Sequence, residues 1–264
     1  MRKDYRTVVE ESVQLNEIDA VEEQWTGIWE KGGWEPRSLK YFKFKEEYRL
    51  MRPYLNKLSS GAKGLDGGCG LGEWMLFLSK FNFEIKGIDI SKILIEKLSK
   101  LMKKFSFIQS DIRNLPIKDN SIDFYYSWGT FEHFEEGLDS CISEAYRVLK
   151  PDAYLFVSVP YDNLRHSIKS IFFSKSKIKA QTKPQRFYQW RLTQNELSEY
   201  LSRNGFNVEK VKTVHKRQGM QRFLQQNFYM NPTSLPCRLL AFIIAPIVPG
   251  KLIGHMIIAV AVKK

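Results

Sequence analysis

A glycine-rich segment constrains the fold of this chain more than any other feature. Residues 64–74 read GLDGGCGLGEW, with four glycines among six residues, directly after an acidic residue. Glycine lacks Cβ, accepts positive φ and lets another group lie against the main chain, but it costs more conformational entropy on folding than other residues. We therefore interpret the segment as a ligand-binding turn rather than a flexible surface loop.

The segments around this turn alternate between short apolar runs and helical patterns. Strands are expected at 62–66, 84–89, 105–111, 122–129 and 153–160, and helices at 73–80, 93–103 and 138–149. This alternation predicts an α/β fold, with a mostly parallel sheet and helices on both faces. Further along, Thr193 and Glu196 predict a capped helix that ends before Gly205, and two more strands are expected at 207–214 and 255–262.

The length of 264 residues suits one large α/β domain with additions, or two small domains. We predict a helical N-terminal extension over residues 1–60 and the α/β domain over 61–264, with insertions at about 162–192 and 218–253. The second insertion contains an apolar stretch, 239–249, that is too short to span a bilayer.

The charge distribution indicates what kind of partner the chain binds. The net charge of +12 is uneven, because residues 165–264 hold 18 Lys and Arg against 3 Asp and Glu. This C-terminal part suggests an anionic partner, and nucleic acid, anionic lipid and a phosphorylated substrate all fit.

Three widely spaced cysteines match neither a disulfide framework nor a zinc site, and no apolar run follows the first residues. We therefore expect a cytoplasmic protein without a signal peptide.

The glycine loop follows a strand and opens a helix, where sheets of this kind bind ligands. It is no phosphate-binding P-loop, because no Gly-Lys-Ser/Thr follows, and Glu73 occupies the third glycine position of the dinucleotide motif. What remains is D-x-G-x-G-x-G from Asp66. Asp89 ends the next expected strand, where it can accept from a ribose diol, and Asp111 ends the third, where it can accept from an adenine amino group.

These motifs resemble the class I (Rossmann-like) S-adenosylmethionine-dependent methyltransferases, in particular the methyltransferase type 11, or UbiE-like, group. The similarity covers residues 60–160 and 186–214, and includes IKGIDIS, FIQSDIRNLPIKDNSIDFYYSWGTFEHF and EAYRVLKPDAYLFVSVP. It implies S-adenosyl-L-methionine as cofactor and a Rossmann-like seven-stranded, mostly parallel sheet. The last strand, within 254–264, would be antiparallel.

The resemblance also implies roles for individual residues. Gly68 and Gly70 would hold the methionine part of the cofactor, Asp89 the ribose, and Asp111 with Ile112 the adenine. The complete expected cofactor set is Asp66, Gly67, Gly68, Gly70, Asp89, Ile90, Asp111, Ile112 and Trp128. Gly67 stands where the family usually has an aliphatic residue, and we expect it to loosen the packing.

The expected activity is methyl transfer to a small-molecule, sugar or lipid-linked acceptor, through O- or N-methylation. The alternatives are an RNA methyltransferase and a catalytically inactive binding module. His133 is the candidate general base, with a structural or cofactor-side role as the alternative. No metal is expected, since the four histidines share no ligand spacing.

Two segments are candidates for partner binding. Residues 186–197, RFYQWRLTQNEL, predict either a lid or an acceptor-site wall, in which Arg186 or Arg191 would bind a phosphate or carboxylate. Residues 237–253 predict either a buried segment or a patch on the inner face of an anionic membrane, flanked by basic side chains: Arg217, Arg222, Arg238 and Lys251.

Overall fold

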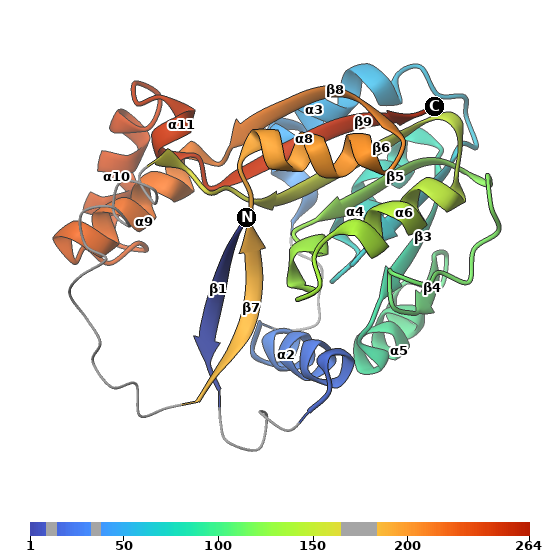
Figure 1. Ribbon diagram of the computed structural model, residues 1–264, viewed down its shortest axis with the longest axis horizontal. Helices are drawn as coiled ribbons and strands as arrows, with labels where there is room; N and C mark the ends of the chain where they lie inside the picture. Colours follow the sequence, from blue (N-terminus) through green and yellow to red (C-terminus); the bar gives the residue numbers. More distant parts are fainter. Residues whose placement is uncertain (9–14, 33–37, 165–183) are drawn as a thin grey trace.

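The computed structural model of the protein describes residues 1–8, 15–32, 38–164 and 184–264. Its centre is a seven-stranded sheet in the order β4-β3-β2-β5-β6-β9-β8 (Figure 1). Strands β2 to β6 run parallel to one another, whereas β9 is antiparallel to both β6 and β8, which confirms the predicted fold class. The strands are β2 (Lys63–Gly67), β3 (Glu84–Asp89), β4 (Ser106–Gln109), β5 (Ile122–Trp128), β6 (Leu149–Pro160), β8 (Phe206–Val214) and β9 (Met256–Lys263).

The strand order places a ligand site at the carboxyl ends of β2 and β5. From β2 the chain adds β3 and β4 on one side, and then β5 and β6 on the other. A crevice opens where the order reverses in this way, and ligands bind there. Gly67 ends β2 and Trp128 ends β5, so the glycine loop and the predicted tryptophan meet at this point.

Helices cover both faces of the sheet because inward side chains alternate along each strand. Tyr125 and Leu155 face one core, under α6 and α8, whereas Phe124 and Phe156 face the other, under α3, α4 and α5. The helices are α3 (Glu46–Leu55), α4 (Glu73–Leu78), α5 (Lys92–Leu101), α6 (Asp139–Val148) and α8 (Gln194–Arg203), with short 3₁₀ turns η1 (Leu39–Phe44), η2 (Ser79–Phe81) and η3 (Phe131–His133).

Local signals placed several boundaries correctly. The Thr193–Glu196 capping box is present, and Gly205 follows α8 with φ of 92°. Strand β4 is shorter than predicted, since it ends at Gln109 rather than at residue 111. The reason is a turn: the Asp111 carboxylate accepts the Arg113 backbone N–H at 2.9 Å, which directs the chain away from the sheet.

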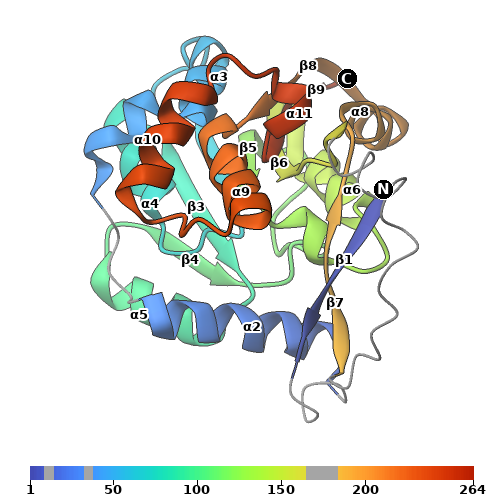
Figure 2. The same ribbon diagram turned by 90° about the vertical axis from the view of Figure 1, so that its left-hand side faces the viewer.

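The prediction that the N-terminal extension is helical is wrong for its first residues. Residues Arg2–Thr7 form strand β1, which pairs antiparallel with β7 (Gln185–Arg191) in a separate two-stranded sheet. The pairing joins segments more than 170 residues apart, so no local pattern announces it. Helix α2 (Glu17–Gly32) follows and lies alongside α5, where Thr26 Oγ1 is 2.7 Å from Ser91 Oγ (Figure 2).

The second insertion forms a small helical unit of its own: α9 (Lys216–Phe228), α10 (Leu235–Ile244) and α11 (Gly250–Ile253). It lies at one end of the molecule, beyond β8 and β9 (Figure 1). None of the helices in the described parts of the chain is long and apolar enough to cross a membrane. The basic part of the first insertion, residues 165–183, lies outside the described residues.

Candidate active site

The glycine loop needs glycine for two reasons. Gly68, Gly70 and Gly72 have φ of 75°, 50° and 68°, which other residues rarely adopt. In addition, a Cβ at Gly68 would lie 2.2 Å from Thr130 Oγ1, and one at Gly70 would lie 3.0 Å from the Trp29 ring. The loop therefore holds bare backbone against neighbouring elements at the N-terminus of α4.

Gly67 tightens the packing, contrary to expectation. A Cβ here would lie 2.2 Å from Tyr125 Oη, and the Tyr125 side chain is fully buried in the neighbouring strand β5. The ring thus occupies the space that an aliphatic side chain would need. The Gly67 carbonyl also accepts a hydrogen bond from Ser127 Oγ at 2.7 Å, which fixes the end of β2.

Two buried carboxyl groups stand at the ends of β2 and β3. Asp89 Oδ2 accepts the Gly70 N–H at 3.0 Å and Oδ1 accepts the Ser91 N–H at 3.1 Å. Burial nevertheless raises the pKa of Asp89, and it raises the pKa of Asp66 well above its usual range, with a further contribution from the Asp89 charge. Each Asp89 oxygen retains acceptor capacity for a ligand hydroxyl.

Asp111 does not reach the cavity. The Arg113 guanidinium holds its carboxylate, with Nη2 2.8 Å from Oδ2, and also contacts Glu17 and Glu136. The neighbours of Asp111 do line the cavity, so the expected adenine contact would fall to Ser110 and Ile112. The predicted residues that line it are Asp66, Gly68, Gly70, Asp89, Ile90, Ile112, Trp128 and His133, whereas Gly67 and Asp111 do not.

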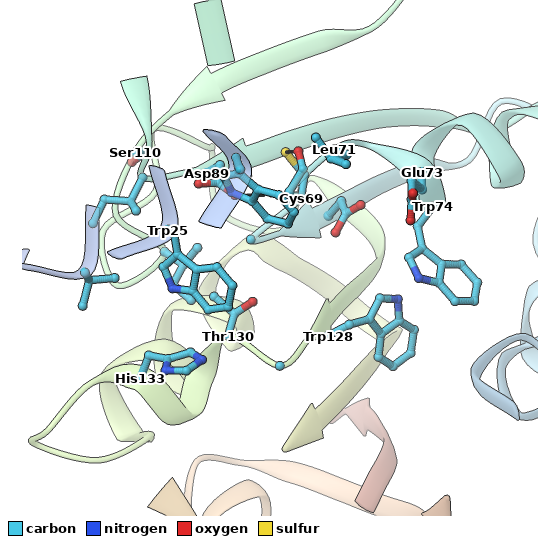
Figure 3. A pocket seen from close by; sticks show the side chains of 18 of the residues that line it. Trp25, Cys69, Leu71, Glu73, Trp74, Asp89, Ser110, Trp128, Thr130 and His133 are labelled. Atoms are coloured by element: carbon cyan, nitrogen blue, oxygen red, sulfur yellow. Dashed lines mark hydrogen bonds between the residues drawn. The ribbon is translucent and has the colours of Figure 1, made fainter. Parts of the chain in front are cut away.

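Four tryptophans form the cavity wall, and sequence reasoning found only Trp128. Trp25 and Trp29 come from α2, and Trp74 from α4. Figure 3 shows Trp25, Trp74 and Trp128 around the cavity. Among the described residues, the buried indole N–H groups of Trp29 and Trp128 have no hydrogen-bond partner. An unpaired buried donor is costly, so both N–H groups fit a ligand that brings acceptors. The i, i+4 spacing of Trp25 and Trp29 could have placed them on one helix face.

His133 lies at the cavity edge beside Trp25, with ring centroids 5.1 Å apart (Figure 3). Its ring centroid is also 5.3 Å from that of Tyr188. Its Nδ1 is 2.7 Å from the Tyr188 backbone carbonyl, which is an acceptor, so we assign the proton to Nδ1. Burial lowers the pKa of His133 to about 4, which makes the ring neutral near pH 7. In this tautomer Nε2 carries the lone pair, but the lowered pKa makes it a weak base, and the Gly129 backbone also contacts the ring.

The segment 186–197 supports the site rather than lining it. Strand β7 positions His133 through the Tyr188 carbonyl, and Trp190 Nε1 donates to the Phe134 carbonyl at 3.0 Å. Both arginines already have partners: Arg191 Nε is 2.6 Å from Asp4 Oδ2, and Arg186 Nη2 donates to the carbonyls of residues 15 and 16. Arg186 nevertheless lines a second pocket together with His133, and anion binding by either arginine stays a prediction.

Comparison with known proteins agrees with this geometry. Residues 65–157 match the family model described as a methyltransferase domain. The chain is 25% identical over 192 residues to a demethylmenaquinone methyltransferase of Staphylococcus haemolyticus, which covers 64% of this chain and 79% of that protein. It is 30% identical over 115 residues to the demethylmenaquinone methyltransferase of Staphylococcus saprophyticus. This match covers 40% of this chain and 49% of that relative, so about half of its length.

Solved structures share the fold. A phosphoethanolamine N-methyltransferase 2 of Haemonchus contortus, in complex with phosphomonomethylethanolamine and S-adenosylhomocysteine, aligns over 94% of this chain and 59% of that one, with a TM-score of 0.58 and 17% identity. A SAM-dependent methyltransferase of Aquifex aeolicus aligns over 95% of this chain and 100% of that one, with a TM-score of 0.53 and 17% identity.

The sheet, the glycine loop and these comparisons define a class I, Rossmann-like methyltransferase that uses S-adenosyl-L-methionine. Within the chain, residues 65–157 are the part that matches a methyltransferase domain. The cavity fits the cofactor: bare glycine backbone, the Asp89 carboxyl, tryptophan faces and two unpaired indole N–H groups match its methionine, ribose and adenine parts.

Proposed function

We propose that the enzyme methylates a small aromatic ring of the quinol type that is carried on a lipid. The observation that carries this proposal is the aromatic cavity wall, where Trp74 and Trp128 lie with ring centroids 5.5 Å apart. Flat aromatic faces favour a ring-shaped acceptor by stacking. The relatives named demethylmenaquinone methyltransferase support the same acceptor class.

In this proposal the protein mainly binds and orients, because the bound cofactor supplies an already activated methyl group. Gly68, Gly70 and Asp89 hold the cofactor, and the tryptophan wall aligns the acceptor. His133 Nε2 accepts the proton of an acceptor hydroxyl, which makes the ring more nucleophilic. The Tyr188 carbonyl holds the imidazole in the tautomer that this role requires.

Replacing His133 tests this assignment. We expect His133→Ala to lower turnover by about 10²–10⁴ with cofactor affinity nearly unchanged, because a general base contributes only to the chemical step. The control His133→Asn retains an amide N–H for the Tyr188 carbonyl but lacks the base, and it should be equally slow. A parallel loss of cofactor binding in His133→Asn would mean that the residue is a binding or structural element.

A product assay identifies the acceptor. Purified enzyme with labelled S-adenosylmethionine is offered, separately, a naphthoquinol with a short prenyl tail, phosphoethanolamine, a lipid-linked glycan and bulk RNA. We expect label only in the quinol arm. Label in the RNA arm would favour an RNA methyltransferase, and cofactor binding without any product would favour an inactive binding module.

We further propose that the enzyme works on the cytoplasmic face of a membrane, because a lipid-borne acceptor stays there. The excess of basic residues after residue 164 supports this location, since cytoplasmic leaflets carry anionic lipids.

A further inference from the structure

Helix α10 carries its large and small apolar residues on unexpected sides. Its buried contacts with α9 are made by Cys237, Ala241 and Ala245, whereas Leu239, Phe242, Ile243 and Ile247 are between 51% and 81% exposed. A surface helix of a globular protein normally buries its large apolar side chains and exposes polar ones. This reversed order makes α10 and the residues up to 247 an unpartnered apolar surface.

A second segment, distant in sequence, extends the same surface. The 3₁₀ turn η1 buries Phe42 but leaves Tyr41 66% and Phe44 75% exposed. Phe44 lines one groove together with Leu235, Leu239 and Phe242 of α10. We call this combination, η1 with α10, the docking face, and residues of α3 and α9 also line its groove.

The groove in the docking face is cationic. It is open, has a volume of about 1010 Å³ and contains five basic residues: Lys45, Arg49, Lys216, Arg217 and Arg238. Its two acids face inward to one histidine: Glu46 accepts the His215 backbone N–H, and Glu47 Oε1 is 3.0 Å from His215 Nε2. Within the described parts of the chain, no salt bridge involves any of the five cations.

We propose that the docking face binds an anionic phospholipid bilayer, with lipid phosphates in the groove and the exposed apolar side chains of α10 and η1 in the interface. The combination is decisive: phosphates match the five cations, and acyl chains match the aliphatic side chains. RNA offers the charge but no partner for Leu239 and Ile243. A second copy of the chain would bring two cationic grooves together, which is repulsive.

The docking face adjoins the cofactor cavity. Lys45 Nζ lies 3.8 Å from the Phe42 ring centroid, and the Phe42 ring packs 4.9 Å from that of Trp74, a residue of the cavity wall. One layer of side chains therefore separates bound lipid from the site. If the acceptor is lipid-borne, as the proposed function holds, docking would place the bilayer that carries it one side-chain layer from the cavity.

Vesicle co-sedimentation of the full chain tests the docking face without any methyl acceptor, so its outcome is independent of the proposed substrate. Vesicles of phosphatidylcholine alone and with phosphatidylglycerol are compared at low and high salt. We expect binding only to the anionic vesicles, and weaker binding at high salt. Arg217→Gln with Arg238→Gln should reduce the affinity about 30-fold, since each cation near the surface contributes about 1 kcal/mol.

Matched variants separate the contributions. Phe242→Ser with Ile243→Ser should reduce the affinity at least about tenfold, because less apolar area enters the interface. Lys103→Gln with Lys118→Gln, which removes two exposed cations outside the groove, should bind like the parent. Cofactor binding by each variant confirms that it is folded. The proposal is overturned if all variants bind anionic vesicles equally, or if the parent does not bind them at low salt. It is also overturned if the protein binds RNA and the variant Phe242→Ser with Ile243→Ser binds it equally well, or if the protein is a dimer that this double substitution dissociates.

Discussion

At the scale of single residues, the site depends on buried carboxyl groups whose protonation the fold controls. Asp89 is fixed by two backbone N–H groups, and Asp66 is buried nearby. Glu132 is buried as well, and among the described residues its Oε2 has no hydrogen-bond partner. Burial raises the pKa of Glu132 to about 8, and a hydrogen bond to its own backbone and the Arg191 charge oppose this shift.

Asp89→Ala should weaken S-adenosylmethionine binding by roughly 1–3 kcal/mol, because the ribose hydroxyls lose a charged acceptor. Calorimetry with the demethylated product measures the effect. Glu96→Ala, at an exposed position of α5, is the control and should bind like the parent. Equal affinity of Asp89→Ala and the parent would contradict the assignment of Asp89 to the cofactor.

Glu132 should make stability depend on pH. Because its pKa is raised on folding, the folded state binds more protons than the unfolded state between about pH 4.5 and 8. The free energy of unfolding should therefore fall as pH rises through this window, by up to about 1.4 kcal/mol per pH unit from this one group. Glu132→Gln should flatten the dependence in urea unfolding at pH 6 and 8.5, and an unchanged slope would show that the buried carboxyl is ionised.

At the scale of elements, helix α2 closes the cofactor cavity. Its Trp25 and Trp29 rings stack with centroids 6.0 Å apart, and Lys92 N donates to Glu22 Oε1 at 3.0 Å, which ties α2 to α5. Helix α2 thus contacts α5, although the bonded residues Glu22 and Lys92 are 70 positions apart in the sequence. It forms one wall of the cavity at the carboxyl ends of the strands.

Trp29→Ala should weaken cofactor binding by about 1–2 kcal/mol, since an aromatic face and an indole N–H donor are removed together. Ile28→Ala is the matched control, because Ile28 lies on the same helix but is 41% exposed and does not line the cavity. If both variants bind the cofactor like the parent, α2 is a cover without binding contacts.

At the scale of the whole molecule, the two chain ends differ in what they hold together. Strand β9 lies between β6 and β8, and the buried Lys263 Nζ donates to Asn120 Oδ1 and to the carbonyls of Tyr146 and Leu149. Strand β1, in contrast, pairs only with β7 at the edge of the site.

Truncations at the two ends should therefore have different effects. A chain that stops at residue 255 loses β9 and should not fold cooperatively, because β8 loses the strand that joins it to the sheet and β6 loses one of its two neighbours. A chain that starts at residue 9 should keep the main sheet and bind cofactor, although Arg191 loses Asp4 and turnover falls as His133 loosens. Circular dichroism with thermal unfolding compares both, and a folded chain ending at 255 would refute the central role of β9.

Much of the fold could be predicted because its information is local. The alternation of strands and helices, the capping box at Thr193 and the special φ values of the glycine loop each follow from neighbouring residues. Asp89 could be placed at the cavity for the same reason, since it ends a strand next to the glycine loop, whereas Trp128 was expected there from the family resemblance.

By itself, the sequence determined a parallel α/β sheet with a cofactor loop at the end of its first strand, because residue periodicity and glycine stereochemistry act within a few residues. Only the tertiary structure decided that residues 2–7 form a strand, that Arg113 diverts Asp111 from the cavity, that Tyr125 requires Gly67, and that α10 exposes its large side chains. Each of these depends on contacts between segments distant in the chain, or on which face of an element finds a partner, and the local pattern carries neither.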